Sequence, residues 1–382
     1  MMGGRCFFFA GGGTGGHIYP AIAIAERIIK LERGVKVHFF CSTRSIDLRI
    51  LSKTGFEYTS LPVCGFSARP DKLIGFCASF LESCRIAKRV IIESKSAVVI
   101  GVGGFVSAPV CFAAHKLKVP IVLLNVDIVP GRANKIIARW ADKIFVQFED
   151  TRGLFLPLIR GRGAERGAKV DVVGCPLRIG FDSPEPKKAI EQLGLERGKK
   201  ILLITGASSG SENINEAICS LLEKLDGFTD GWQIVHLTGQ ANFEDVQKRY
   251  VGVKISHKVL DYFDDMPNLL SAADLVVGRS GAVSVAEYAA ANAPTICIPY
   301  PYHKDRHQYL NAGKLVEAGA AVIVDDLPQR KDTAQRLWAE LEELMKDEKK
   351  RKKMAENCKA VSNVQASSKI AEQLFSLGKA EP

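Results

Sequence analysis

The fold is decided by a stretch near the start of the chain, Cys6-Phe-Phe-Phe-Ala-Gly-Gly-Gly-Thr-Gly-Gly-His17. Its apolar run predicts a buried strand, and the glycines that follow predict a loop that other groups approach closely. A helix is expected next, because apolar residues recur on one face from Ile18 to Ile29 and Pro20 suits a first turn. Strand, glycine loop and helix in this order are typical of a Rossmann-like domain.

The same pattern continues and then starts again. Later apolar stretches predict further buried strands, and their alternation with helical stretches indicates a parallel α/β sheet. The pattern restarts at Lys200–Thr205, which is followed by the small-residue loop Gly206-Ala-Ser-Ser-Gly210 and a helix. The sequence therefore predicts two Rossmann-like α/β domains facing a cleft, because ligands bind outside the carboxyl ends of such strands. The other predicted strands are Val35–Cys41, Ala97–Gly101, Pro120–Leu124, Lys143–Gln147, Gln233–Thr238, Leu275–Gly278 and Thr295–Pro299.

The stretch from Arg178 to Lys188 interrupts the pattern and predicts a linker between the domains. We expect one domain over residues 1–177 and a second over residues 189–345. Residues 346–382 are predicted to form a C-terminal helix that packs back toward the N-terminal domain.

Composition narrows the function classes. Of the 382 residues, 47% are apolar and 25% charged, which is ordinary for a globular protein, and no apolar run is long enough to cross a bilayer. The start of the chain lacks the pattern of a signal peptide, so we expect a location on the cytoplasmic side. The ten cysteines are scattered, which argues against a metal site. The net charge of +10 suits a partner with phosphates, but no nucleic-acid-binding motif is present.

Gly11 to Gly16 also satisfy G-x-G-x-x-G, the dinucleotide-binding pattern. An NAD enzyme would carry an acidic residue for the ribose at the end of the second strand, where this chain has no carboxylate before Asp47. Arg44 would suit a 2′-phosphate, so an NADP-binding oxidoreductase stays open as an alternative. The remaining interpretation is that the glycines serve only close packing.

Two motifs in the second half point to a nucleotide sugar. Gly206 to Ser211 place hydroxyls and N–H groups at a helix start, which suits a diphosphate, although an ordinary helix cap would use the same residues. In Arg279 to Glu287 a strand ends and a helix opens, and the Glu287 carboxylate can accept two hydrogen bonds from a ribose diol. His303 to Gln308, with Asn311, form a polar cluster after a strand and are predicted to contact sugar hydroxyls.

Taken together, the motifs resemble those of the peptidoglycan N-acetylglucosaminyltransferases, the MurG family. The resemblance implies a glycosyltransferase-B fold and an inverting mechanism without metal or cofactor. N-acetylglucosamine would pass from UDP-GlcNAc to the C4 hydroxyl of undecaprenyl-pyrophosphoryl-MurNAc-pentapeptide, in peptidoglycan synthesis at the cytoplasmic face of the inner membrane. The resemblance rests on Gly11 to His17, Gly101 to Ser107, Gly131 to Lys135, Gly174 to Arg178, Asp264 to Met266, Arg279 to Glu287 and His303 to Asn311.

The resemblance implies that residues 1–177 form an acceptor and membrane-associating domain and residues 189–345 a UDP-sugar donor domain. It also assigns donor contacts. Phe263, Met266 and Arg178 would lie near the uracil, and Glu287 would hold the ribose. Ser208 and Ser280 would face the diphosphate, while His307 and Gln308 would contact the GlcNAc hydroxyls. The remaining donor contacts are Thr14, Gly15 and Gly16 at the end of the first glycine loop.

On the acceptor side, the resemblance implies that Gly13, Gly103 and Gly104 receive the acceptor pyrophosphate, with Asn134 close by. His17 ends the first glycine loop, and an imidazole with a pKa near 6.5 suits a general base at neutral pH. Asp127 is the rival base.

Three positions depart from the family pattern. Leu124-Asn-Val-Asp127 stands where the family has His-Glu-Gln-Asn, so Asn125 and Asp127 differ. Ser209 and His307 each replace a Gln. These departures keep open a related UDP-sugar transferase that acts on another membrane lipid.

Between Arg69 and Lys95 apolar and basic side chains alternate, among them Leu73, Ile74, Phe76 and Phe80. They predict either a buried helix with a basic outer face or a patch that rests on an anionic membrane, where each basic residue adds roughly 1 kcal/mol. The basic residues concerned are Arg69, Lys72, Arg85, Lys88 and Arg89.

Overall fold

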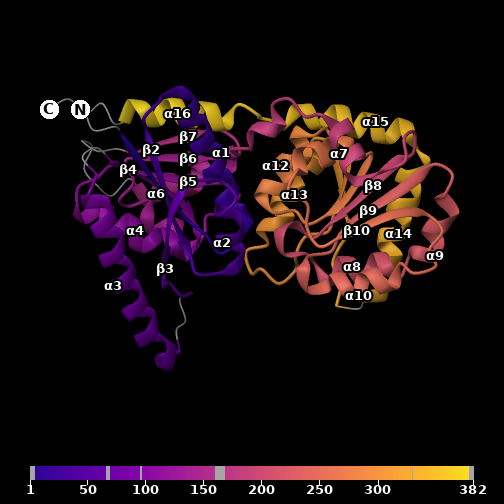
Figure 1. Ribbon diagram of the computed structural model, residues 1–382, viewed down its shortest axis with the longest axis horizontal. Coiled ribbons are helices and arrows are strands. Elements are labelled where there is room, and N and C mark those ends of the chain that lie inside the picture. The colour runs from indigo at the N-terminus through magenta and orange to yellow at the C-terminus, as the bar shows by residue number, and fades with distance from the viewer. Residues whose placement is uncertain (1–4, 66–68, 95–96, 160–167, 329, 378–382) are drawn as a thin grey trace. The chain divides into compact units, whose positions relative to one another are not determined.

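The computed structural model describes residues 5–65, 69–94, 97–159, 168–328 and 330–377, and the chain divides into two compact units (Figure 1). Unit 1 runs to Arg178 and includes the C-terminal segment from Gln365; unit 2 runs from Ile179 to Val364. The C-terminal residues form two helices where one was predicted. Helix α15 (Glu348–Asn357) belongs to unit 2 and α16 (Ala366–Leu377) to unit 1. The break contains Val361-Ser-Asn-Val364, four residues of modest helix propensity.

The sheet of unit 1 has seven strands in the order β3-β2-β1-β4-β5-β6-β7, and its neighbouring strands run parallel. Central strand β1 is buried along its whole length, as its apolar run predicts. The strands are β1 (Cys6–Gly11), β2 (Lys36–Ser42), β3 (Glu57–Leu61), β4 (Ala97–Gly103), β5 (Ile121–Asn125), β6 (Lys143–Val146) and β7 (Lys169–Val172).

Helices follow most strands of unit 1, and α16 returns from the C-terminus to pack on α1 (Figure 1). Arg5 donates a hydrogen bond of 2.9 Å to the Phe375 carbonyl, and the rings of Phe7 and Phe375 meet edge to face at 5.4 Å. The C-terminal helix is therefore part of the packing of unit 1. The helices are α1 (Gly15–Leu31), α2 (Ser45–Leu51), α3 (Pro70–Ile92), α4 (Gly104–Lys116), α5 (Arg132–Ile137) and α6 (Glu149–Ile159).

The sheet of unit 2 has six strands in the order β10-β9-β8-β11-β12-β13, again parallel. This order repeats that of the first six strands of unit 1, so the predicted repeat of architecture is confirmed. The strands are β8 (Lys200–Thr205), β9 (Trp232–Leu237), β10 (Ser256–Leu260), β11 (Leu275–Gly278), β12 (Thr295–Cys297) and β13 (Ala321–Ile323).

Helices and short 3-10 turns join the strands of unit 2. Its core is a cluster of buried side chains, most of them aliphatic, that includes residues of β8 and β9 and the aromatic ring of Trp232. The helices are α7 (Pro186–Leu193), α8 (Glu212–Cys219), α9 (Leu222–Leu225), α10 (Phe243–Arg249), α11 (Met266–Ala272), α12 (Ala282–Ala290), α13 (His307–Glu317) and α14 (Arg330–Lys346). The turns are η2 (Ile179–Phe181), η3 (Ala207–Ser209), η4 (Asp226–Phe228), η5 (Gln240–Asn242) and η6 (Cys358–Ala360).

In each unit the strand order reverses beside the first strand, between β1 and β4 and between β8 and β11. Ligands of such sheets bind at this point, outside the carboxyl ends of the strands. Both glycine loops follow directly on the first strand of their unit, so each lies at a reversal point.

Candidate functional site

The first glycine loop is fixed from beneath by a buried carboxylate. Asp47, in α2, accepts the N–H of Gly13 at 2.8 and 3.0 Å and the hydroxyl of Ser42 at 2.5 Å. A Cβ at Gly12 would lie 2.3 Å from this carboxylate, which requires a glycine. The Gly13 N–H is thus engaged inside unit 1, so in this conformation Gly13 cannot offer that N–H to the acceptor pyrophosphate.

The same geometry removes the basis for the dinucleotide interpretation. The Asp47 oxygens are occupied by the glycine loop, so this carboxylate is not placed to hold a ribose. Arg44 donates to the Gly13 carbonyl at 3.1 Å, and its guanidinium lies 5.2 Å from the ring centre of Phe105. Asp47, which an NAD enzyme would need, and Arg44, which an NADP enzyme would need, are both used to hold the loop.

His17, in the first turn of α1, has one ring nitrogen tied to the loop. Its Nδ1 lies 3.2 Å from the Gly12 carbonyl oxygen and 3.4 Å from the Thr14 hydroxyl. A carbonyl only accepts hydrogen bonds, so the hydrogen-bond pattern assigns the proton of the neutral ring to Nδ1 and leaves a lone pair on Nε2. Burial lowers the pKa of His17, against the opposing effects of Asp127, the Gly12 hydrogen bond and Asp47.

Gly103 and Gly104 let the end of β4 pass close to this imidazole. Their φ angles are +107° and +75°, which favour glycine. A Cβ at Gly103 would lie 2.9 Å from His17 Nε2, and one at Gly104 would lie 2.6 Å from the Gly12 carbonyl oxygen. The two predicted acceptor glycines therefore also make room for the ring of His17.

A chain of amides lies at the carboxyl end of β5. Asn134 donates to Asn125 Oδ1 at 2.8 Å, and Asn125 donates to the Asp127 carbonyl at 2.6 Å. Asn134 is buried, and its Oδ1 has no hydrogen-bond partner among the residues that the structure describes. A buried amide oxygen in this state is suited to accept a substrate O–H or N–H. The structure thus brings Asn134 and Asp127 together through Asn125.

The second glycine loop is held by close backbone packing. A Cβ at Gly206 would lie 2.1 Å from the Ser211 nitrogen, and one at Gly210 would lie 2.2 Å from the Thr238 carbonyl oxygen. Ser208 and Ser209 form the 3-10 turn η3 and remain partly or fully exposed. Their hydroxyls and the N-terminus of α8 can donate to a diphosphate.

Beneath this loop lies a buried ion pair that the sequence interpretation missed. Arg279 lies 2.8 Å from Asp326 and donates to the Ser211 hydroxyl at 2.7 Å and to the Ile298 carbonyl at 2.9 Å. Asn213 donates to the other oxygen of Asp326 at 2.9 Å. These contacts tie the glycine loop to the carboxyl ends of β11, β12 and β13. The motif beginning at Arg279 was recognised, but nothing in the sequence marked Asp326 as its partner.

Ser280 does not present its side chain as predicted. It is buried, and its hydroxyl donates to the Gln308 carbonyl at 2.9 Å, because α13 packs across the start of α12. Contact between Ser280 and a diphosphate would have to come from its backbone. The side-chain oxygen of Gln308 accepts from the Tyr300 N–H at 3.0 Å, so its contact with a sugar hydroxyl stays a prediction for the side-chain N–H groups.

His307 is set by its neighbours. Its Nδ1 lies 2.7 Å from the Asp305 carboxylate, and its ring stacks on His303 with 4.2 Å between the ring centres. The Gln of the family pattern has no imidazole ring for such a stack, and the contact of His307 with the sugar stays a prediction.

The residues predicted to contact the uracil and the ribose lie on separate elements. Glu287 is half-buried in the second turn of α12, Met266 begins α11, and Phe263 is 7% exposed just before it. Arg178, where the first segment of unit 1 ends, lies 4.4 Å from the ring centre of Tyr19. Their contacts with a nucleotide stay predictions.

Within the described ranges, no group of three His, Cys, Asp or Glu side chains could hold a metal ion. In the same part of the chain, no helix is long and apolar enough to cross a membrane.

Comparison with known families matches both units. Residues 7–146 match the glycosyltransferase family 28 N-terminal domain, and residues 201–374 match the C-terminal domain of the same family. The chain is 35% identical to the UDP-N-acetylglucosamine–N-acetylmuramyl-(pentapeptide) pyrophosphoryl-undecaprenol N-acetylglucosamine transferase of Halothermothrix orenii, over 92% of this chain and 93% of that protein. The chain belongs to this transferase family.

Solved structures agree with the fold of the family. The MurG structure from Acinetobacter baumannii aligns with a TM-score of 0.70 at 23% identity, covering 98% of this chain and 99% of that one. A UDP-GlcNAc 2-epimerase from Neisseria meningitidis bound to UDP-GlcNAc aligns with a TM-score of 0.66 at 15% identity, over 97% and 99% of the two chains. The fold is therefore shared by transferases and epimerases, and it is the sequence relationship that separates them.

Proposed function

We propose that this chain transfers GlcNAc from UDP-GlcNAc to the C4 hydroxyl of undecaprenyl-pyrophosphoryl-MurNAc-pentapeptide, with inversion at the anomeric carbon. The relatives that match this chain over nearly their whole length are named for this reaction. The observation that carries the mechanism is the tie between His17 Nδ1 and the Gly12 carbonyl, which leaves Nε2 unprotonated.

The base is His17. As the acceptor oxygen attacks the anomeric carbon, its proton moves to Nε2 and the bond from that carbon to the UDP oxygen breaks, with the electron pair leaving on UDP. The Gly12 carbonyl accepts the Nδ1–H throughout, and it stabilises the imidazolium that forms. The charge of Asp127 acts in the same direction, because it raises the pKa of His17 against the effect of burial.

The donor is bound by unit 2. The N–H groups and hydroxyls of Ser208 and Ser209 and the N-terminus of α8 receive the diphosphate and stabilise the leaving UDP. Glu287 accepts hydrogen bonds from the ribose, and the side-chain N–H groups of Gln308 donate to a GlcNAc hydroxyl. Phe263 and Met266 border the uracil.

The acceptor is bound by unit 1. We assign its pyrophosphate to the backbone N–H groups of Thr14, Gly15, Gly16 and Gly104, because the N–H groups of Gly13 and Gly103 are engaged by Asp47 and by the Ser107 hydroxyl. The resemblance gave Thr14, Gly15 and Gly16 to the donor, and this assignment moves them. Asn134 Oδ1 accepts a hydrogen bond from the acceptor sugar.

Unit 1 rests on an anionic membrane surface through α3. The first half of this helix has exposed apolar side chains, including Ile74 at 78% and Leu81 at 56%, and in Figure 1 it extends beyond the rest of the unit. Large exposed apolar side chains near one another are typical of a membrane or protein interaction site. Exposed Arg85, Lys88 and Arg89 add attraction to anionic lipid. The side chain of Lys72 lies outside the described residues.

An aromatic row extends this face onto α4. The rings of Phe80 and Phe112 lie 6.0 Å apart, and those of Phe112 and Trp140 lie 5.6 Å apart. Lys116 lies 5.4 Å from the ring centre of Phe112. Half-buried aromatic rings beside basic groups suit the interface between lipid headgroups and acyl chains. We therefore place the enzyme peripherally at the cytoplasmic face of the cell membrane.

The test is transfer of radiolabelled GlcNAc from UDP-GlcNAc to the purified lipid-linked acceptor. We expect a labelled lipid product, with activity that survives excess EDTA because the diphosphate is stabilised by protein groups. Labelled product on a different lipid only would contradict the proposed acceptor. Activity that EDTA abolishes and Mg²⁺ restores would contradict the proposed stabilisation of UDP.

A further inference from the structure

A buried chain of polar side chains lies behind the second glycine loop. Tyr250 lies 3.0 Å from His236 Nδ1, and His236 Nε2 lies 3.1 Å from Asn215 Oδ1. Asn215 Nδ2 donates to the Thr238 carbonyl at 3.0 Å. His236, Asn215 and Tyr250 are all at most 3% exposed. None of them was singled out by the sequence motifs.

The Thr238 carbonyl, at one end of this row of polar side chains, fixes the direction of each hydrogen bond in it. The Thr238 carbonyl can only accept, which makes the Asn215 amide nitrogen the donor and directs the amide oxygen to His236. His236 must then carry its proton on Nε2, and its Nδ1 accepts from the Tyr250 hydroxyl. Burial lowers the pKa of His236 to about 3 and raises that of Tyr250, so both rings stay neutral at working pH. The hydrogen bonds to Asn215 and Tyr250 therefore hold His236 in a single tautomer.

Thr238 and Gly239, at the end of β9, separate the two segments assigned to the donor. On one side the Gly210 and Gly239 backbones pack without room for a Cβ, since a Cβ at Gly239 would lie 2.5 Å from the Ser209 carbonyl oxygen. On the other side Gly239 donates to the Asp261 carbonyl at 3.1 Å, two residues before Phe263. A shift of Thr238 would change the distance between the diphosphate loop and the uracil segment.

We propose that His236 and Tyr250 are positioning residues that, through Asn215, set the spacing between the diphosphate loop and the base-binding segment of the donor site. This inference rests on the proposed function, because it takes unit 2 as the UDP site. It predicts that loss of these hydrogen bonds lowers the affinity for ligands that span both segments, such as UDP. The affinity for uridine, which spans one segment, should change little.

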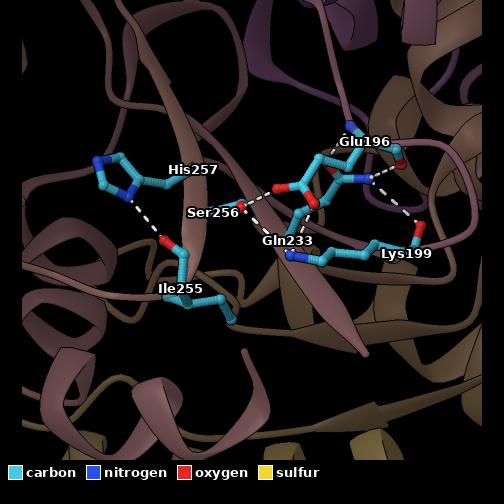
Figure 2. A network of polar contacts seen from close by, with 6 residues as sticks. All are labelled: Glu196, Lys199, Gln233, Ile255, Ser256 and His257. Carbon is cyan, nitrogen blue, oxygen red and sulfur yellow. Dashed lines mark hydrogen bonds and ion pairs between the residues drawn. The ribbon is translucent and has the colours of Figure 1, made fainter. Parts of the chain in front are cut away.

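The alternative is that His236 and Tyr250 only stabilise the fold, and His257 provides a control for it. His257 also lies beside Tyr250, with 4.8 Å between the ring centres, but its Nδ1 donates to the Ile255 carbonyl at 2.8 Å and it has no link to Asn215. Figure 2 shows His257 and its bond to Ile255 at the amino end of β10, beside the network of Glu196, Lys199, Gln233 and Ser256. This end of the sheet is opposite to the one that carries the donor loops.

The variants are His236→Leu, His236→Gln, Tyr250→Phe and the control His257→Gln. The Gln amide nitrogen can occupy the place of Nε2 and keep the hydrogen bond to Asn215, whereas Leu cannot. We expect His236→Leu to weaken UDP binding about 10- to 100-fold, which is the effect of an unsatisfied buried amide, and to leave the inhibition constant of uridine nearly unchanged. His236→Gln should recover most of the affinity, and His257→Gln should bind UDP like the wild type.

Calorimetry with UDP, inhibition by uridine and thermal melts decide the outcome. Equal UDP affinity in folded His236→Leu and in wild type would overturn the proposal. Equal losses for UDP and uridine, or a loss that His257→Gln reproduces, would do the same. If His236→Leu does not fold, Tyr250→Phe keeps the volume, and we expect about a 3- to 10-fold loss for UDP alone. Wild-type protein that fails to bind UDP would instead contradict the proposed function.

Discussion

The two glycine loops occupy the same place in the same topology, yet different chemistry holds them. In unit 1 the Asp47 carboxylate accepts four hydrogen bonds from the loop and from Ser42. In unit 2 the Arg279 guanidinium, paired with Asp326, donates to Ser211 and to the end of β12. A negative charge thus lies beneath the first loop, and a cation with its own counter-charge lies beneath the second.

This difference separates the tasks of the loops. The Gly13 N–H is engaged by a carboxylate, so the first loop binds an anion less well at that position. The Gly12 carbonyl of the same loop fixes the ring of His17. The second loop leaves its hydroxyls and helix N-terminus directed outward, which suits a diphosphate. Topology places the loops, and the buried charged side chains decide what each loop does.

The largest effect is expected at the carboxylate beneath the first loop. Asp47→Ala leaves two buried N–H groups without acceptors, so we expect the free energy of unfolding to fall by about 2–5 kcal/mol. Chemical denaturation measures it. Glu149→Ala is the control, because this exposed carboxylate of α6 is paired with Arg152 on the surface. A loss below that of the control would show that Asp47 does not hold the loop.

The ion pair beneath the second loop should respond differently to paired changes. Arg279→Met leaves Asp326 charged and buried, which costs about 3–5 kcal/mol, and the double variant Arg279→Met/Asp326→Leu should recover a large part of this loss. Asp47 has no cationic partner among the described residues, so no second change can rescue it in this way. A double variant less stable than Arg279→Met would contradict the assigned pairing.

The ribose contact gives a smaller effect that is confined to binding. Glu287→Ala should raise the KM for UDP-GlcNAc about 10- to 100-fold, because a hydrogen bond to a charged group is worth about 1.5–3 kcal/mol. Glu317→Ala, on α13 and paired with Lys314, is the control. Unchanged donor affinity in calorimetry would remove the ribose role.

The smallest effect per residue is expected on α3. Reversal of Arg85, Lys88 and Arg89 to Glu removes about 1 kcal/mol of attraction to anionic lipid per residue, so the variant should sediment less with anionic vesicles and still bind UDP. The same reversal at Lys349, Lys352 and Lys353 on α15 is the matched control, since these lysines are exposed on unit 2. If only the α15 variant leaves the vesicles, the membrane face is not on α3.

The central strands could be predicted from the sequence, and the edges could not. Strands β1, β4 and β8 are continuous apolar runs, because they are covered on both faces. The four strands that the pattern missed, β3, β7, β10 and β13, are the edge strands of the two sheets. β3, β7 and β10 mix polar with apolar residues, as expected of partly exposed edge strands, and β13 is apolar but only three residues long.

The site was predictable where a motif is local in the chain. The glycine loops and His17 are contiguous in sequence, whereas Asp47 and Asp326 reach their partners only through the fold. The inward direction of the Ser280 hydroxyl depends on how α13 packs, which no spacing rule contains.

The pH dependence of kcat/KM tests the central claim, that neutral His17 is the general base. Burial lowers the pKa of His17, so the deprotonated, active form persists below pH 6.5, and activity should fall only as the pH drops through that lowered pKa. His17→Ala should lower kcat by about 10²–10⁴-fold and remove this acid limb, while Asp127→Asn should be mild. An acid limb that His17→Ala retains, with turnover abolished by Asp127→Asn, would contradict the account and assign the base to the carboxylate.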